Sequence, residues 1–231
     1  MTAIEKIKQL YNVTSVENQG FADSELQQVE KRLHIKLPLK LREYYLALGK
    51  NEAINYSHNR LLKPRGEEIG FSDDRYLVFY EENQVVAYWG IKEEDLGMDN
   101  PPVYGFYGDE WMKETGTTED FLLLMAVYNG TLGGLKYVAN AFTTLSPAVV
   151  KEIETRWELL PEISWEKQKV YTADYREVIS LSFDDQQQCT GIFAGTDIQD
   201  RFDNMLDTLD IDWSYTSYDE EEEDEDEGEE D

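Results

Sequence analysis

Cysteine is nearly absent from this chain, with Cys189 the single example among 231 residues. One thiol can form neither an intramolecular disulfide nor a thiolate metal cluster, which fits a reducing compartment. Histidine is scarce too, and His34 and His58 lie in no spacing typical of a zinc site. A lone histidine beside apolar neighbours is more often structural than catalytic. The sequence therefore predicts no bound metal and no cofactor.

Long apolar runs are also missing. The longest, residues 121–128, has eight residues, whereas a membrane-spanning helix needs about 20. Residues 1–10 contain no apolar stretch of the kind that a signal peptide requires. We therefore expect a cytoplasmic protein with no membrane partner.

Positive charge is the third shortage. The chain has 21 Lys and Arg against 49 Asp and Glu, a net charge of −28, and 12 of the 13 residues 219–231 are acidic. Nucleic acids and anionic membranes bind proteins through Lys and Arg, so neither is expected as a partner. An acidic surface attracts basic proteins, or it serves only solubility. Residues 214–231 are predicted to form a disordered acidic tail.

Signatures of catalysis are missing as well. The sequence has no Gly-x-Ser-x-Gly elbow, no complete phosphate-binding loop and no dinucleotide-binding fingerprint. Paired carboxylates such as Asp73–Asp74 or Asp109–Glu110 are capable of acid–base chemistry, but a chain with 49 acids contains such pairs by chance. Cys189 lies in a predicted strand without a neighbouring histidine. We therefore expect a protein that is not an enzyme.

Hydrophobic periodicity predicts an α+β fold with one domain over residues 1–213. Helices are predicted at residues 4–10, 23–33, 38–48, 118–128, 146–160 and 198–209. Strands are predicted at residues 76–80, 85–89, 178–183 and 189–193. Residues 101–107 are expected to form an edge segment, because proline cannot donate a hydrogen bond to a central ladder.

Four stretches in a fixed order resemble the SMI1/KNR4 (SUKH) superfamily. They are residues 26–38 continued by 41–49, residues 82–84 followed by 88–90, residues 100–104, and the helix at 118–128. His34 stands where the family usually has glycine, and Asn100 where aspartate is common. A residue other than glycine is tolerable at such a helix end if the backbone avoids positive φ.

The resemblance implies a single SMI1/KNR4-like domain, with a mostly antiparallel mixed sheet packed against several helices. It also implies a bacterial immunity protein, which neutralises a cognate toxin domain, often a nuclease, by stoichiometric binding. An acidic surface suits this role, since carboxylates can replace phosphates in the basic cleft of a nuclease. A regulatory scaffold with several weaker protein partners is the alternative that the family also offers.

Binding hot spots favour aromatic anchors ringed by polar contacts, so acids beside aromatic residues are the predicted contacts. The predicted partner-binding residues are Glu81, Glu82, Asp109, Glu110, Trp111 and Glu114. The first two lie at a predicted hairpin turn beside Tyr80, and the other four in a predicted loop. The alternative is that Trp111 closes the core while the acids form a solvated rim.

Overall fold

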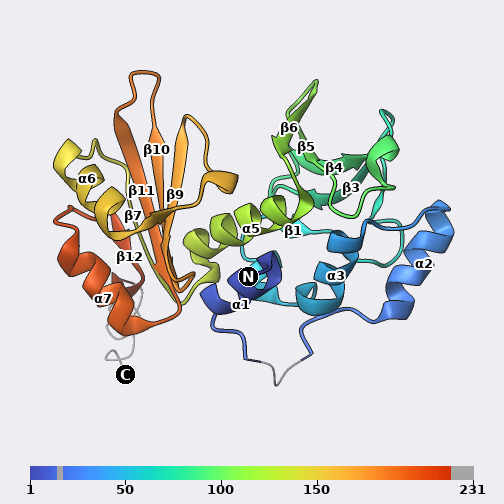
Figure 1. Ribbon diagram of the computed structural model, residues 1–231, viewed down its shortest axis with the longest axis horizontal. Coiled ribbons are helices and arrows are strands. Elements are labelled where there is room, and N and C mark those ends of the chain that lie inside the picture. The colour runs from blue at the N-terminus through green and yellow to red at the C-terminus, as the bar shows by residue number, and fades with distance from the viewer. Residues whose placement is uncertain (15–17, 220–231) are drawn as a thin grey trace, which may run out of the picture. The chain divides into compact units, whose positions relative to one another are not determined.

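The computed structural model describes residues 1–14 and 18–219. The backbone forms two compact units, one made of Met1–Lys8 and Thr14–Asn129, the other of Gln9–Val13 and Gly130–Asp231 (Figure 1). Each unit combines helices with an antiparallel sheet, which confirms the predicted α+β class. The prediction of one family domain over residues 1–213 stays a prediction, and the structure adds the division at residue 129.

The first unit contains most of the helices and one six-stranded sheet. Its helices are α1 (Ala3–Leu10), α2 (Asp23–Leu33), α3 (Leu39–Leu48), α4 (Glu52–Asn55) and α5 (Thr118–Asn129), with a short 3₁₀ turn η1 (Glu93–Asp95). Its strands are β1 (Arg60–Leu61), β2 (Gly70–Phe71), β3 (Tyr76–Glu81), β4 (Tyr88–Lys92), β5 (Val103–Phe106) and β6 (Trp111–Thr115). The strand order is β1-β3-β4-β5-β6, and β2 pairs separately with β3.

Helix α5 provides the centre of this unit's core. Its apolar run buries Phe121, whose ring contacts the rings of Phe79 and Tyr80 at 5.5 Å and that of Trp89 at 5.9 Å between centroids. These three residues come from β3 and β4, so α5 covers one face of the sheet. The eight-residue apolar run of the sequence is therefore a buried helix, as predicted.

The end of α5 is fixed by the amide of Asn129, which is fully buried. Its Nδ2 donates to the backbone oxygens of Ile54 and Asn59, both at 2.9 Å, and lies 3.1 Å from the hydroxyl of Tyr80. Its Oδ1 accepts from the Asn59 N–H at 2.9 Å. One side chain thus joins α4, α5, β3 and the loop before β1.

Helix α2 ends at His34 with φ 56° and ψ 38°, a left-handed conformation. The condition set for a residue other than glycine, that the backbone avoid positive φ, is therefore not met. Histidine adopts this conformation more readily than most residues other than glycine. The Ile35 N–H donates to the Glu30 carbonyl at 3.1 Å and closes the helix end.

Three strand predictions in this unit need correction. Strand β4 begins at Tyr88, because Val85 has φ 62° and Glu82 Oε2 accepts from the Gln84 and Val86 N–H groups, which lengthens the turn. Strand β5 is not an edge, since it lies between β4 and β6 and the prolines precede it. Trp111 begins β6 and does not lie in a loop.

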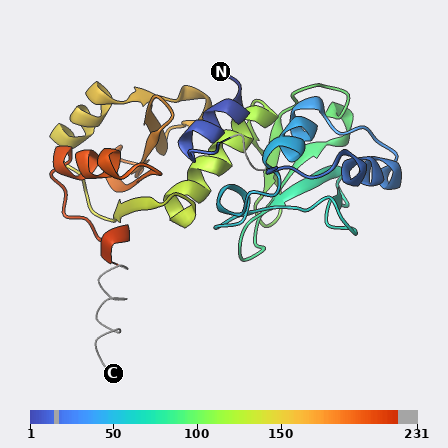
Figure 2. The same cartoon turned by 90° about the horizontal axis from the view of Figure 1, so that it is seen from below.

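The second unit contains another six-stranded antiparallel sheet, of order β12-β7-β11-β10-β9-β8. Its strands are β7 (Tyr137–Ala141), β8 (Glu158–Leu159), β9 (Gln168–Ala173), β10 (Glu177–Phe183), β11 (Cys189–Thr196) and β12 (Tyr215–Thr216). Its helices are α6 (Pro147–Arg156) and α7 (Gln199–Thr208), with short turns η2 (Gly130–Gly134) and η3 (Pro161–Ile163). Helices α6 and α7 share one apolar cluster with the sheet, which they cover on the same face (Figure 1, Figure 2).

The folded part of the second unit extends past the predicted boundary at residue 213. Residues Tyr215–Thr216 pair with β7, and the Tyr218 ring contacts that of Phe202 at 5.4 Å between centroids. These aromatic residues come directly before the acidic run in the sequence. They are part of the fold because their rings and backbone pack and pair with the second unit. The predicted disorder of residues 220–231 lies outside the described residues.

Candidate partner-binding surface

Four residues form one row across the sheet of the first unit. Glu81 of β3 pairs with Tyr88 of β4, Tyr88 with Phe106 of β5, and Phe106 with Trp111 of β6. Directly paired residues of an antiparallel sheet have their side chains on the same face. One residue of each predicted cluster, Glu81 and Trp111, therefore lies in this row, with two further aromatic residues between them.

This row lies on the face of the sheet that α5 does not cover. Trp89 is buried and packs on Phe121 of α5, so the preceding residue Tyr88 faces the opposite side. Phe106 and Trp111 follow Tyr88 to that side because they are its partners in the row. All three aromatic rings remain partly accessible to solvent.

A groove of about 420 Å³ follows this outer face, and we call it the aromatic groove. Its floor consists of Val78, Tyr88, Phe106 and Trp111 from four adjacent strands. Its wall is the segment around β2, which contributes Phe71 and four acidic residues, Glu67, Glu68, Asp73 and Asp74. No Lys, Arg or His is among the described residues that line it, so the groove has one sign of charge.

Trp111 is held in the floor by stacking. Its ring is parallel to that of Tyr76, with centroids 3.9 Å apart and an interplanar angle of 7°, and it contacts Phe106 at 5.4 Å. Its Nε1 is buried and has no hydrogen-bond partner among residues 1–14 and 18–219. Trp111 therefore packs on the sheet and also lines the groove, while its predicted contact with a partner stays a prediction.

The acids of the first predicted cluster are engaged within the fold. The carboxylate of Glu81 forms an ion pair with Arg60 of β1 at 2.8 Å. Glu82 Oε2 accepts from the N–H groups of Gln84 and Val86, at 2.7 and 3.4 Å, and so shapes the turn. Neither residue lines the aromatic groove, although Glu81 lines a second groove of about 510 Å³ that shares Glu68, Val78 and Tyr88 with it.

The acids of the second predicted cluster lie in different places on the sheet. Asp109 and Glu110 are exposed at the turn between β5 and β6, where Gly108 has φ 89°. Glu114 instead accepts hydrogen bonds from the Tyr107 hydroxyl and, at 3.3 Å, from Trp89 Nε1, on the side of the sheet that faces α5. Burial and the adjacent Glu114 carboxylate both raise the pKa of the Tyr107 hydroxyl. Glu114 is thus separated from Trp111 by the sheet.

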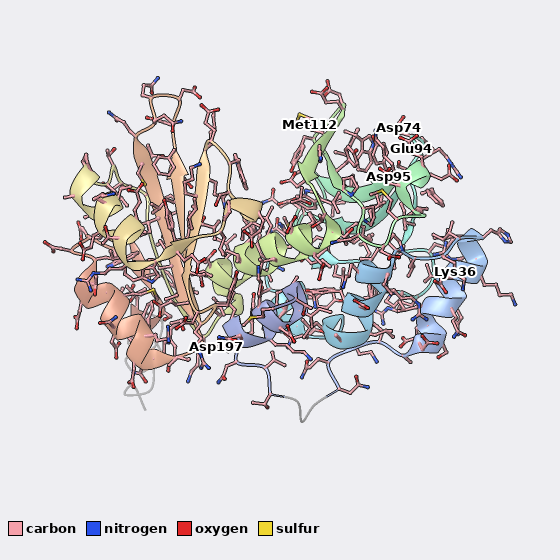
Figure 3. All side chains as sticks on the ribbon, viewed as in Figure 1. Lys36, Asp74, Glu94, Asp95, Met112 and Asp197 are labelled. Atoms are coloured by element: carbon pink, nitrogen blue, oxygen red, sulfur yellow. The ribbon has the colours of Figure 1, made fainter. Side chains whose placement is uncertain are left out.

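Three acids of the groove wall were not among the predicted contacts. Glu67, Asp73 and Asp74 are exposed and have no ion pair within the described part of the chain, whereas Glu68 pairs with Arg65 at 3.3 Å. Asp74, on the loop between β2 and β3, is labelled in Figure 3. The sequence offered the Asp73–Asp74 pair, but no local pattern connects it with Trp111, almost 40 residues later.

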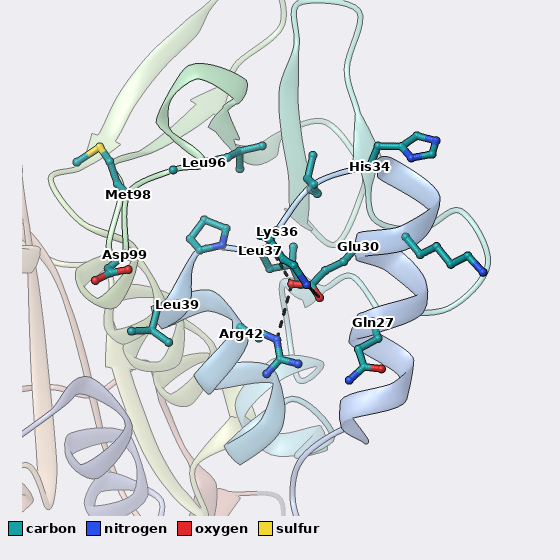
Figure 4. Close-up of a pocket in the computed structure, with 14 residues that line it drawn as sticks. Gln27, Glu30, His34, Lys36, Leu37, Leu39, Arg42, Leu96, Met98 and Asp99 are labelled. Carbon is teal, nitrogen blue, oxygen red and sulfur yellow. Dashed lines mark hydrogen bonds and ion pairs between the residues drawn. The ribbon is translucent and has the colours of Figure 1, made fainter.

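Another pocket of this unit, about 800 Å³, lies at the junction of α2 and α3 (Figure 4). Glu30 is buried at its base, 5% exposed, and accepts from the Leu37 N–H at 3.1 Å. Lys36 Nζ lies 3.3 Å and Arg42 Nε 3.7 Å from the same carboxylate. The Leu37–Pro38 motif of the resemblance is thus fixed by Glu30, whose charge is neutralised by neighbouring bases.

The second unit has a smaller pocket of about 300 Å³ beside α6, lined in part by Cys189. Burial raises the pKa of the Cys189 thiol, which disfavours the nucleophilic thiolate. Within residues 1–14 and 18–219, no three His, Cys, Asp or Glu side chains converge as a metal site would require. No helix in that part of the chain is both long enough and apolar enough to cross a bilayer.

The aromatic groove is therefore a hollow of the first unit in which apolar surface and unpaired charge meet. Comparison with known proteins adds no relative to this picture: the chain matches no protein-family model, no curated protein and no solved structure. The resemblance to the SMI1/KNR4 superfamily consequently stays a prediction.

Proposed function

We propose that this protein binds a basic protein partner and neutralises it stoichiometrically, without catalysing a reaction. The observation that supports the proposal is the aromatic groove, where the rings of Tyr88, Phe106 and Trp111 line the same hollow as four carboxylates. Three of these carboxylates form no ion pair within the described residues. Aromatic anchors surrounded by polar groups are typical of binding hot spots. A net charge of −28 adds long-range attraction for a cationic partner.

The resemblance gives this partner an identity: a cognate toxin domain, with the nuclease class favoured. A nuclease needs a basic cleft for its substrate, and a carboxylate-bearing surface can occupy such a cleft in place of phosphates. On this proposal the protein acts in the bacterial cytoplasm, does not bind nucleic acid itself, and forms a 1:1 complex. Complexes of this kind are among the tightest known.

The test is a titration of toxin activity. The C-terminal domain of a large secreted protein encoded beside this chain would be assayed with increasing amounts of the purified full-length protein. A linear loss of activity that ends at one equivalent supports stoichiometric neutralisation. Complete inactivation by a small fraction of one equivalent would indicate turnover and contradict the proposal, as would full activity at excess protein across salt concentrations.

A regulatory scaffold is the second candidate, and the hairpin turns favour it. Val86 is 66% exposed and Tyr107 is 41% exposed, so this unit offers apolar surface outside the aromatic groove. A scaffold would bind several partners with micromolar affinity instead of one partner with nanomolar affinity. Substituting Val86→Ser would then weaken some partners and spare others, whereas an immunity protein with a groove-centred interface would lose little affinity.

A further inference from the structure

We infer that the aromatic groove receives a single arginine side chain of the basic partner. The inference rests on the proposed function and specifies the chemistry by which the partner is recognised. The guanidinium would lie over the rings of the floor, with the carboxylates of the wall at its edge. Three features of the groove lead to this side chain: its size, the sign of its charge and the orientation of its aromatic rings.

The size of the groove suits one side chain with its flanking backbone. Its volume of about 420 Å³ is at the lower end of the range for small-molecule sites. Phe106 and Trp111 contact each other at 5.4 Å with an interplanar angle of 48°, so their faces form an open angle and not a closed stack. A planar cation has room against these faces, and a cation over an aromatic face is attracted by the ring quadrupole.

The charge of the wall selects a cation. Glu67, Asp73 and Asp74 have no basic partner in the described part of the chain, and the lining contains no base. The guanidinium nearest to Asp73 and Asp74 in the sequence, that of Arg75, binds Glu93, with Nε 2.8 Å from the carboxylate. Arg65, two residues before Glu67, pairs with Glu68 at 3.3 Å. The wall therefore keeps a negative charge that a partner's side chain can neutralise.

Arginine fits better than lysine because its guanidinium is planar and weakly hydrated, and so stacks on aromatic rings. The chain itself provides an example at the rim of the groove. The guanidinium carbon of Arg75 lies 4.5 Å from the ring centroid of Phe71, a residue of the wall, while its edge binds Glu93. An arginine in the groove would repeat this arrangement, with Trp111 and Phe106 as the rings and Asp73 and Asp74 as the carboxylates.

The experiment uses the full-length ¹⁵N-labelled protein and three capped tripeptides, acetyl-Gly-X-Gly-amide, in which X is arginine, lysine or citrulline. Citrulline keeps the shape of arginine without its charge. The indole N–H signal of Trp111, assigned with the W111F variant, reports on the floor. We expect saturable shifts at Trp111, Tyr88 and Phe106 with the arginine peptide, and binding at least about tenfold weaker with citrulline, as loss of a charged contact predicts.

Two variants with the same change in charge separate local from general electrostatics. E67Q/D73N/D74N removes the three carboxylates of the wall that form no ion pair and keeps the size of their side chains, and should weaken the arginine peptide at least about fivefold. The control, E158Q/D207N/D210N, neutralises three exposed acids of the second unit and should change the affinity by less than about twofold. Equal losses in both variants would overturn the inference, because only the net charge would then matter.

Other outcomes would also overturn it. If the citrulline or the lysine peptide binds as tightly as the arginine peptide, the groove does not recognise a guanidinium. If the shifts are confined to residues outside the groove, the peptide binds elsewhere. Shifts of the same signals with protein concentration alone, without peptide, would assign the groove to a second copy of this chain. If E67Q/D73N/D74N neutralises a toxin as well as the wild type does, the inference fails while the proposed function stands.

Discussion

The rings of Trp111 and Tyr76 stack face to face although their strands, β6 and β3, are separated by β4 and β5. Gly90 of β4 permits this approach, since a Cβ at that position would lie 3.2 Å from the Tyr76 Cβ. Tyr76 thereby packs against Trp111 in the floor of the aromatic groove. The rigidity of the floor, and with it the presentation of Trp111, depends on this pair.

The stacking energy is measurable by a double-mutant cycle. We expect Y76L and W111L each to lower the free energy of unfolding, and the double variant to lose less than the sum. The coupling should be about 1 kcal/mol, as for other aromatic pairs. Urea denaturation of the four proteins, followed by far-ultraviolet circular dichroism, gives the value. Additivity of the two single losses would show that the stack contributes no stability.

Asn129 is the residue whose loss should cost the most stability for its size. N129A leaves the backbone oxygens of Ile54 and Asn59 and the N–H of Asn59 without their partner in a buried site. We expect a loss of about 3 kcal/mol from unsatisfied buried groups. N83A, at an exposed asparagine of a turn, is the control and should cost less than about 0.5 kcal/mol. Equal effects would contradict the role of the network.

Replacing His34 by glycine, the residue that the family resemblance implies at this position, should stabilise the protein. The φ of 56° at His34 is strained for a residue with a Cβ. We expect a gain of about 0.5–1 kcal/mol, since the relieved strain exceeds the entropy that glycine loses on folding. H34A keeps the strain and serves as the control. Thermal unfolding at fixed pH measures the stability of both variants. An increase in stability for H34A equal to that for H34G would contradict the assigned strain.

Asp197 should make stability depend on pH. Burial raises the pKa of its carboxyl group, while the hydrogen bond from the Lys136 N–H at 2.9 Å lowers it, and burial has the larger effect (Figure 3). A raised pKa means that the folded chain holds this proton more tightly than the unfolded chain. The free energy of unfolding therefore falls as pH rises through the interval between the unfolded and the folded pKa.

D197N removes this titration and keeps an oxygen that accepts from Lys136. We expect D197N to be more stable than the wild type at neutral pH, with the advantage disappearing below the ordinary pKa of aspartate. Urea denaturation over a series of pH values measures the difference. D200N, an exposed acid in the first turn of α7, is the matched control. A constant difference between D197N and the wild type at every pH would contradict the assignment.

The sequence predicted elements whose signal is local. Helix α5 follows from one apolar run, and Ser146 begins α6 because its hydroxyl accepts from the Val149 N–H, as a cap does. The predicted end of α6 at residue 160 was too late, since the helix ends at Arg156 and Trp157 is extended. Strand β6 was missed because a run of Met, Lys and Glu resembles a loop.

The groove depends on relationships that no local pattern contains. Register shifts in the β3–β4 and β5–β6 pairings interrupt the alternation of faces, so the side to which Trp111 or Glu114 points cannot be read from spacing. The predicted contacts included Trp111, which lines the groove, but placed Glu114 beside it. The carboxylates that do lie near Trp111 belong to the segment around β2, which the family resemblance hardly covers.

Calorimetry can measure directly whether carboxylates of the aromatic groove bind a basic partner. The full-length protein and its E67Q/D73N/D74N variant would each be titrated with the candidate toxin domain at low and at physiological salt. We expect a 1:1 complex of nanomolar or higher affinity for the wild type, tighter at low salt, and at least about tenfold weaker for the variant. Absence of binding at both salt concentrations, or equal affinity of the two proteins, would contradict this expectation.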